Sequence, residues 1–207
     1  MERKSRTAEL WVEPLAPQHD RAAFSCGVPE LDTYLWRQAS QDQRRSLSAV
    51  FVLTADGKTI AGFYSLSAHS ILGEDLPAEI AAKLPRFPLP VTLLGRMAVA
   101  EPMQGQGWGE FLLLDALRRA SIGSSQVASW AVVVDAKAGA LDFYLKHGFI
   151  PLPAMPDRLF LPMKTIEKAF KAIGTRCLAI DPDIEHLPAV NALSEFVTNR
   201  AESHRIG

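Results

Sequence analysis

Apolar residues in the first half of this 207-residue chain follow two different spacings. Residues 10–15 alternate between apolar and polar, which is typical of a strand with one buried face. Residues 30–45 instead place apolar side chains every three or four positions, which predicts one amphipathic helix. Two further apolar segments flank Asp56-Gly57, and this dipeptide predicts a hairpin turn. We therefore expect strands at 10–15, 49–53 and 60–68 and helices at 30–45 and 76–84.

The second half contains two nearly continuous apolar runs, residues 91–99 and 130–134. Strands buried on both faces have this pattern. A mostly apolar helix is expected between them at 107–120, and the order strand, turn, helix, strand is a crossover that joins parallel strands. The prolines of residues 84–90 exclude a helix and a central strand from that segment. The remaining expected elements are a helix at 138–147, capped by Gly148, and a strand at 158–163.

The composition is that of an ordinary globular protein, with 48% hydrophobic and 22% charged residues. The formal net charge of -1 indicates no nucleic-acid or membrane partner, so a polyanion site would need local clustering of charge. The five histidines lack metal-ligand spacing, and we expect no metal. Cys26 and Cys177 are far apart, which favours two reduced thiols. The chain has no apolar targeting region and no run long enough for a membrane span, so we expect a cytoplasmic protein without a membrane partner.

Changes in polarity along the chain predict three parts. Residues 1–8 are polar and are expected to be a flexible N-terminus. Residues 9–172 hold the predicted strands and form one domain. Residues 173–207 follow as an extension, in which apolar residues between 187 and 197 recur at helical spacing and predict one more helix.

A glycine-rich turn connects the strand at 91–99 to the next helix. Its sequence is Gln104-Gly105-Gln106-Gly107-Trp108-Gly109. Glycines let the backbone approach a ligand closely, and a helix N-terminus adds unpaired N–H donors that suit a pyrophosphate. A P-loop would need Gly-Lys-Ser/Thr where Gly109-Glu110-Phe111 stands, and the spacing of a dinucleotide fingerprint is broken. The alternative is that this segment is only a tight connection between strand and helix and binds nothing.

The turn resembles a known family signature. Gln104-x-x-Gly107-x-Gly109 is similar to the Gln/Arg-x-x-Gly-x-Gly/Ala motif of the GCN5-related N-acetyltransferases, the GNAT family. The resemblance implies an α/β (α+β) fold: a central mixed, mostly antiparallel sheet with a splayed parallel strand pair, flanked by helices. It also implies that acetyl-CoA binds here. The residues implied to contact it are Met97, Ala98 and Val99 on the strand and Gln104, Gly105, Gln106, Gly107, Trp108 and Gly109 in the turn.

Further motifs resemble the acetyltransferase toxins of type II toxin–antitoxin systems. They are Phe24-Ser25-Cys26-Gly27, Leu31-Asp32-x-x-Leu35, Gly62-Phe63-Tyr64-Ser65-Leu66-Ser67, Leu94-Gly95-Arg96-Met97-Ala98-Val99, Val134-Asp135-Ala136-Lys137 and Phe143-Tyr144-x-x-x-Gly148-Phe149. This resemblance implies acetylation of the α-amino group of an aminoacyl-tRNA, by direct transfer, which blocks translation. It also implies a small ribbon-helix-helix antitoxin as partner, and a homodimer is an assembly to test.

Acetyl transfer needs a neutral amine and a proton for the departing thiolate. Tyr144 is our candidate for the general acid, because a tyrosine hydroxyl carries a proton at neutral pH. The structural alternative is that Phe143 and Tyr144 both pack on the sheet. Asp135 ends a strand and is expected to cap the helix that begins near Lys137 rather than to act in catalysis. No histidine motif supports Cys26 as a nucleophile.

A tRNA acceptor would need local basic surface. Arg86 and Arg96 flank the strand that leads to the glycine turn, and they are our candidates for substrate contacts. Arg37, Arg44 and Arg45 share one predicted helix, although solvated charge is the usual role of such residues. Two other functions stay open: an acetyltransferase for a small amine or a protein N-terminus, and a degenerate domain that binds coenzyme A or a partner without turnover.

Overall fold

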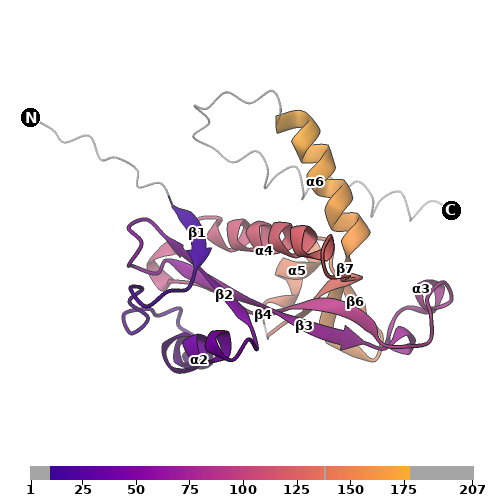
Figure 1. The fold of residues 1–207 in the computed structure, drawn as a ribbon, viewed down its shortest axis with the longest axis horizontal. Helices are drawn as coiled ribbons and strands as arrows, with labels where there is room; N and C mark the ends of the chain where they lie inside the picture. Colours follow the sequence, from indigo (N-terminus) through magenta and orange to yellow (C-terminus); the bar gives the residue numbers. More distant parts are fainter. Residues whose placement is uncertain (1–9, 138, 178–207) are drawn as a thin grey trace, which may run out of the picture. The chain divides into compact units, whose positions relative to one another are not determined.

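The computed structural model describes residues 10–137 and 139–177. Within them, the strands join in a mixed sheet of seven in the order β1-β2-β3-β4-β5-β7-β6 (Figure 1). The strands are β1 (Trp11–Pro14), β2 (Ala49–Thr54), β3 (Gly62–Ile71), β4 (Leu89–Val99), β5 (Ala131–Asp135), β6 (Ile150–Leu152) and β7 (Met155–Pro162). The helices are α1 (Pro29–Thr33), α2 (Ala39–Arg44), α3 (Ala78–Ala81), α4 (Trp108–Ser124), α5 (Leu141–Lys146) and α6 (Met163–Cys177). Three short turns are η1 (Tyr34–Gln38), η2 (Gly73–Asp75) and η3 (Glu101–Met103).

The parallel pair predicted from the two apolar runs is confirmed. β4 pairs with β5 in parallel, from Thr92 opposite Val132 to Leu94 opposite Val134. β1 with β2, β2 with β3, β5 with β7 and β6 with β7 are all antiparallel. The crossover helix α4 joins β4 to β5, as the strand–turn–helix–strand order requires. The fold is therefore the mixed, mostly antiparallel sheet that the sequence resemblance implied.

The chain forms two compact units that share continuous elements. Among the described residues, the first unit contains residues 10–67 together with Arg96–Asp115, and the second contains Ala68–Gly95 and residues 116–137 and 139–177. β3, β4 and α4 each contribute residues to both units. Each unit has its own buried apolar cluster.

The core of the first unit surrounds Phe63 on β3. Its ring contacts Phe24 edge-on, with 5.4 Å between centroids, and stacks with Tyr34 at 6.2 Å. The other buried members of this cluster are Leu15, Cys26, Leu35, Ala39, Val50, Val52, Ile60 and Ala98. Burial of these side chains fixes the helical segment of residues 29–44 against β2 and β3.

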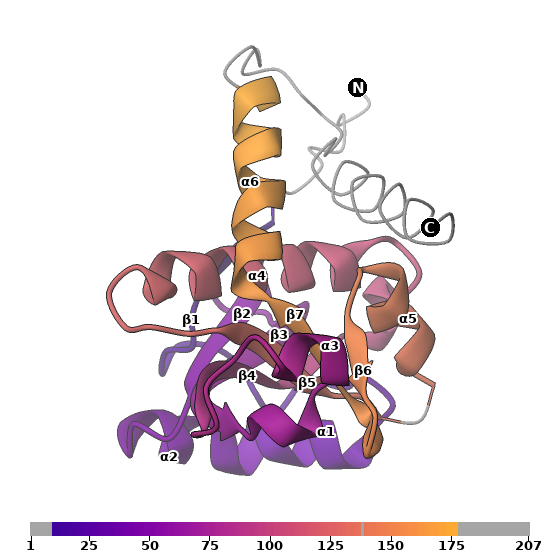
Figure 2. The same cartoon turned by 90° about the vertical axis from the view of Figure 1, so that its right-hand side faces the viewer.

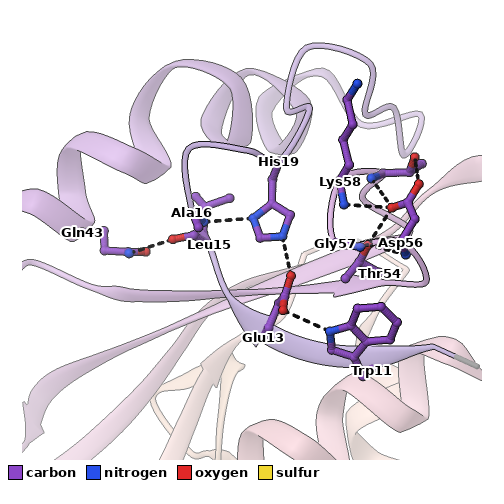
Figure 3. A network of polar contacts seen from close by, with 11 residues as sticks. Trp11, Glu13, Leu15, Ala16, His19, Gln43, Thr54, Asp56, Gly57 and Lys58 are labelled. Carbon is purple, nitrogen blue, oxygen red and sulfur yellow. Dashed lines mark hydrogen bonds and ion pairs between the residues drawn. The ribbon is translucent and has the colours of Figure 1, made fainter.

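Polar side chains fix the connections around β1 and the β2–β3 hairpin (Figure 3). Asp56 accepts hydrogen bonds from the backbone N–H groups of Lys58 and Thr59, which lower the pKa of its carboxyl group. His19 is buried; its Nδ1 accepts the N–H of Ala16 at 2.9 Å, and its Nε2 lies 2.8 Å from a carboxylate oxygen of Glu13. Because Nδ1 accepts, Nε2 carries the proton and donates it to Glu13.

The core of the second unit lies around Phe160 on β7, whose ring stacks on Trp130 at 5.6 Å between centroids. The other buried members are Ile71, Leu76, Leu89, Val91, Ala131, Val133 and Leu152. α6 follows β7 directly and turns away from the strands of this unit (Figure 2). Of the α6 residues whose side chains are described, Met163, Ile166 and Ala169 are buried, and all three lie in its first two turns.

Four details of the predicted elements are wrong. The single helix at 30–45 is interrupted by η1, a π-turn in which the N–H of Ala39 bonds to the carbonyl of Tyr34. β4 begins at Leu89 and so includes Pro90, whose carbonyl still accepts the N–H of Trp130 at 2.7 Å. A proline is tolerated there because it stands next to the strand's first residue.

The other two corrections concern the segment after β5. The helix expected at 138–147 begins only at Leu141, since Gly139 has a φ of +86° and interrupts helical backbone. Asp135 caps no helix, because the cap position of α5 is Ala140. It instead forms a bidentate ion pair with Arg158, with N···O distances of 2.6 and 2.9 Å, which raises the pKa of that arginine. The observed partner of Asp135 is thus an arginine of β7 rather than a helix N-terminus.

The remaining differences concern two missed elements and the two ends of the chain. The sequence prediction missed α6 and the short strand β6. The predicted domain boundary at residue 172 falls inside α6, which continues to Cys177. The flexible N-terminus predicted for residues 1–8 and the helix predicted near 187–197 lie outside the described residues.

Candidate active site

The glycine turn lies in the first unit, between η3 and α4. Gly105 and Gly107 have φ values of +73° and +86°, a left-handed backbone that other residues rarely adopt. A Cβ placed on either glycine would meet no described atom within 4 Å. The turn therefore presents open backbone just before the first helical residue, Trp108. A phosphate group fits such a concave backbone at a helix N-terminus.

The side chain of Gln104 connects this turn to the end of β4 and to the segment around Cys26. Its amide nitrogen donates to the carbonyl of Val99 at 3.0 Å and to the carbonyl of Cys26 at 2.9 Å. Gln106 donates to the carbonyl of Pro102 at 2.9 Å. Both amides are thus engaged with the backbone around the turn. We infer that Gln104 and Gln106 contribute to a cofactor site by shaping the loop.

A second brace comes from the segment Phe24 to Gly27. The N–H of Glu101 donates to the carbonyl of Ser25 at 3.0 Å, and the Ser25 hydroxyl lies 3.3 Å from the carboxylate of Glu101. Asp32 fixes the other side of this segment by accepting the N–H of Cys26 at 2.8 Å. The sequence prediction used these residues only as a family resemblance. Their contact with the glycine loop is non-local, and no sequence signal indicated it.

The strand that leads to the turn is packed closely within the first unit. Ala98 is buried, while Met97 and Val99 are half-buried. A Cβ on Gly62 would lie 2.8 Å from Leu112 and 3.0 Å from the carbonyl of Ala98, so only glycine lets β3 approach β4 and α4 this closely. The N–H of Ala100 then donates to the carbonyl of Ala61 at 2.9 Å. These contacts fix the strand residues that are candidates for contact with the acyl donor.

A buried polar pair fixes the first half of α4. The hydroxyl of Tyr64, which is fully buried on β3, donates to the carboxylate of Asp115. Trp108 and Phe111 pack edge-on at the start of the helix, with 5.7 Å between ring centroids. The Tyr64–Asp115 contact thus joins α4 to β3, while the Trp108–Phe111 contact lies within the first turn of the helix itself.

Tyr144 belongs to the second unit and lies on α5. Its side chain is 8% exposed, and burial raises the pKa of its hydroxyl to about 12. Phe143 and Phe149 pack edge-on against its ring at 5.2 and 5.4 Å. Gly148, with a φ of +81°, ends the helix, and the N–H of Phe149 bonds back to the carbonyl of Tyr144. The position predicted for the helix cap is confirmed, and the environment keeps Tyr144 protonated.

Three residues considered from the sequence remain: Arg86, Arg96 and Cys26. Arg86 is exposed in the second unit. Arg96 is exposed in the first unit, with its guanidinium 3.9 Å from the centroid of the Tyr34 ring. Cys26 is buried, and burial raises the pKa of its thiol to about 11, which is unfavourable for a nucleophile.

Neither a metal centre nor a membrane span is found within residues 10–137 and 139–177. No group of three His, Cys, Asp or Glu side chains in this part could hold a metal ion. None of its helices is both long and apolar enough to cross a bilayer.

A glycine turn with left-handed backbone stands at a helix N-terminus, directly after one strand of a parallel pair, and this arrangement suits a phosphate group. The family model of the acetyltransferase (GNAT) domain matches residues 46–151. The chain therefore belongs to the GNAT family and is an N-acetyltransferase. The open backbone at Gly105 and Gly107 fits its acyl donor, acetyl-CoA.

Comparison with known proteins gives three informative matches, two of them structures of the same toxin. A tRNA-acetylating toxin of Mycobacterium tuberculosis is 36% identical over 146 residues, which cover 70% of this chain and 87% of the toxin. A solved structure of AtaT complexed with acetyl-methionyl-tRNAfMet is similar with a TM-score of 0.73 and 29% identity, covering 78% of this chain and 99% of that chain. A mutant of AtaT bound to the C-terminus of the antitoxin AtaR and acetyl-CoA has a TM-score of 0.67 and 27% identity, covering 78% and 98%.

Proposed function

We propose that this protein is a toxin that acetylates the α-amino group of aminoacyl-tRNA and thereby blocks translation. The observation that carries this proposal is the 36% identity with a tRNA-acetylating toxin over 70% of the chain. The complex of AtaT with an acetylated tRNA supports the same substrate class. Direct transfer of the acetyl group to the amine is consistent with the buried, weakly acidic thiol of Cys26, which is unsuited to an acyl-enzyme.

Each part of the candidate site has a proposed role. The backbone of residues 104–109 binds the pyrophosphate of acetyl-CoA, and Met97, Ala98 and Val99 bind its pantetheine arm and thioester. Tyr144 donates a proton to the departing thiolate. The acceptor amine needs no strong base, because the α-amine of an ester titrates below the roughly 7.7–8.0 of a peptide N-terminus. Arg86 and Arg96 contact the tRNA.

The test of this function is to incubate the purified protein with labelled acetyl-CoA and each of three acceptors. Charged total tRNA should take up label, while uncharged tRNA and protein should not. Turnover should fall steeply as salt rises, because phosphate contacts release counterions. Equal activity on a free amino-acid ester and on charged tRNA would instead favour an acetyltransferase for small amines. No turnover with any amine, but retained binding of acetyl-CoA, would indicate a degenerate domain.

The partners follow from the same proposal. We expect a small antitoxin, and the structure of AtaT with the C-terminus of AtaR supports this class of partner. A ribbon-helix-helix fold for that antitoxin, a homodimer of this chain and a cytoplasmic location are part of the proposal. Expression of the chain alone should arrest growth, and co-expression of a neighbouring open reading frame should restore it. Normal growth with active protein in the cell would count against toxicity, although not against acetyl transfer.

A further inference from the structure

An exposed tryptophan stands on the π-turn of the first unit. Trp36 is 50% exposed, although it lies between Leu35 and Ala39, which are fully buried. The guanidinium of Arg37 lies over its ring, 4.3 Å from the centroid. The buried neighbours fix the backbone of η1, so Trp36 and Arg37 are presented to solvent from a rigid support. π-turns of this kind occur frequently at functional sites.

A second pair of an arginine and an aromatic ring lies on the same turn. Tyr34 is buried, and its hydroxyl lies 3.3 Å from the hydroxyl of Ser48. Arg96 covers its ring at 3.9 Å and stays exposed. Arg96 directly precedes Met97 on β4. Two guanidinium groups, those of Arg37 and Arg96, therefore pack against aromatic rings of η1. Arg96 comes from the strand that is proposed to hold the acyl donor.

Several arginines are exposed on the helical segment that carries Trp36. Arg37, Arg44 and Arg45 are all exposed on this segment, and the amide of Gln41 donates to the carbonyl of Arg37 at 3.2 Å. The same segment, residues 29–45, also carries Glu30, Asp32 and Asp42, so its formal charges balance, and attraction for an anion comes from the individual arginines. Guanidinium groups pair with phosphates, and bases stack on aromatic rings. An exposed tryptophan with an arginine over its ring therefore suits a nucleic acid.

We propose that Trp36 and Arg37 form a stacking platform for an unpaired base of the single-stranded 3′ end of tRNA, with Arg44, Arg45 and Arg96 contacting its phosphates. This inference rests on the proposed function. Stacking on an aromatic ring tolerates any base, because every base has a π-face. Arg37 already holds one face of the indole, which orders the ring before the RNA arrives. The platform would serve every tRNA, whichever amino acid is preferred.

Steady-state kinetics on the full chain test this platform. Trp36→Ala should raise the KM for charged tRNA about 5- to 100-fold and leave kcat within about twofold, as expected for one lost stacking contact. Trp36→Phe, which keeps a ring, should recover most of the affinity. Activity on a free amino-acid ester should be the same in both variants and the parent. An unchanged KM in Trp36→Ala, or an equal loss on the ester, would overturn the platform.

A matched control is available in the same unit. Trp11 is 41% exposed on β1, but its indole N–H donates to Glu13 at 3.0 Å. Trp11→Ala should leave the KM for charged tRNA unchanged. Thermal melting of all variants should stay close to that of the parent, because both side chains lie at the surface. A rise in KM for Trp11→Ala as large as for Trp36→Ala would also overturn the platform.

A binding measurement separates this inference from the proposed function. A short single-stranded RNA ending in CCA should quench the fluorescence of the parent and of Trp11→Phe, but much less that of Trp36→Phe. If charged tRNA is not acetylated while this difference persists, the proposed function fails and the platform stands. Equal quenching in the parent and Trp36→Phe overturns the platform whatever the activity. Loss of antitoxin binding in Trp36→Ala with unchanged RNA binding overturns it too, because the surface would then be a protein interface.

Discussion

The side-chain amide of Gln104 donates to the carbonyl of Cys26 at 2.9 Å, across 78 positions of sequence. The same nitrogen donates to the carbonyl of Val99 at 3.0 Å. One side chain thus joins the glycine loop to the end of β4 and to the segment that follows Phe24. A loop braced in this way loses less conformational entropy when a ligand binds.

Replacement of Gln104 by alanine removes both hydrogen bonds of this brace. We expect the KM for acetyl-CoA to rise about tenfold, because two net hydrogen bonds contribute roughly 1–3 kcal/mol and 1.4 kcal/mol is a factor of ten. kcat should change less, since Gln104 has no proposed part in the chemical step. Gln126→Ala, at an exposed glutamine beyond α4, is the control. A KM for Gln104→Ala within twofold of the parent would contradict the brace.

Acetyl-CoA should stabilise the protein through the glycine turn. At a hundred times its dissociation constant, the ligand adds about 2.7 kcal/mol to the free energy of unfolding. In Gly107→Glu this gain should largely vanish, because Gly107 has a φ of +86° and the new carboxylate would repel phosphates. Gly123, in α4 with equally open space around it, supplies the control Gly123→Glu. Thermal melting with and without acetyl-CoA measures both, and an undiminished gain in Gly107→Glu would exclude the turn.

Tyr144→Phe removes one oxygen from a buried side chain, so folding and the affinity for acetyl-CoA should hardly change. Loss of a general acid costs about 10²–10⁴-fold in rate, or some 3–5 kcal/mol of barrier. The loss should appear in kcat rather than in KM, since the proton is needed in the transition state. Single-turnover acetylation measures it directly. A rate within threefold of the parent would mean that Tyr144 has only a packing role.

The raised pKa of Tyr144 predicts the alkaline side of the pH profile. A general acid acts in its protonated form, and burial raises this pKa to about 12. kcat should therefore stay flat past pH 10, near which an ordinary tyrosine would already lose its proton. A 3′-amide-linked aminoacyl-RNA, which resists alkaline hydrolysis, is the suitable acceptor. A fall in kcat with its midpoint near 10 would show that the group in control is an ordinary exposed phenol.

Asp56 predicts how stability depends on pH in acid. Its hydrogen bonds to the N–H groups of Thr59 and Lys58 lower its pKa in the folded state. The carboxylate therefore stabilises the fold fully above its unfolded pKa of about 3.9, and this contribution is lost as the pH falls further. Asp56→Ala should melt below the parent at pH 7, and the difference should shrink below about pH 4. A difference in melting temperature between Asp56→Ala and the parent that stays the same from pH 7 to pH 3 would contradict this role of Asp56.

Local features of the fold could be predicted from the sequence. The left-handed backbone at Gly105, Gly107 and Gly148 depends on glycine itself, and the parallel strand pair follows from two apolar runs around a helix. The π-turn could not be predicted, because the apolar residues around Tyr34 fit ordinary helical spacing equally well. Asp135 stood where a cap is expected, but its partner Arg158 comes 23 positions later. The Gln104–Cys26 contact was missed for the same reason: it is made between distant segments.

The division of β3, β4 and α4 between two units has a consequence during synthesis. The first unit is interrupted at Ser67 and is completed only by Arg96–Asp115. At about 5–20 residues per second, a ribosome needs roughly 2–10 s for the fifty residues that follow Ser67. Val52 and Phe63 are therefore synthesised well before Ala98, which belongs to the same buried cluster. The closing segment also contains the glycine loop, so the residues that complete the first unit and the loop proposed to hold the acyl donor leave the ribosome together.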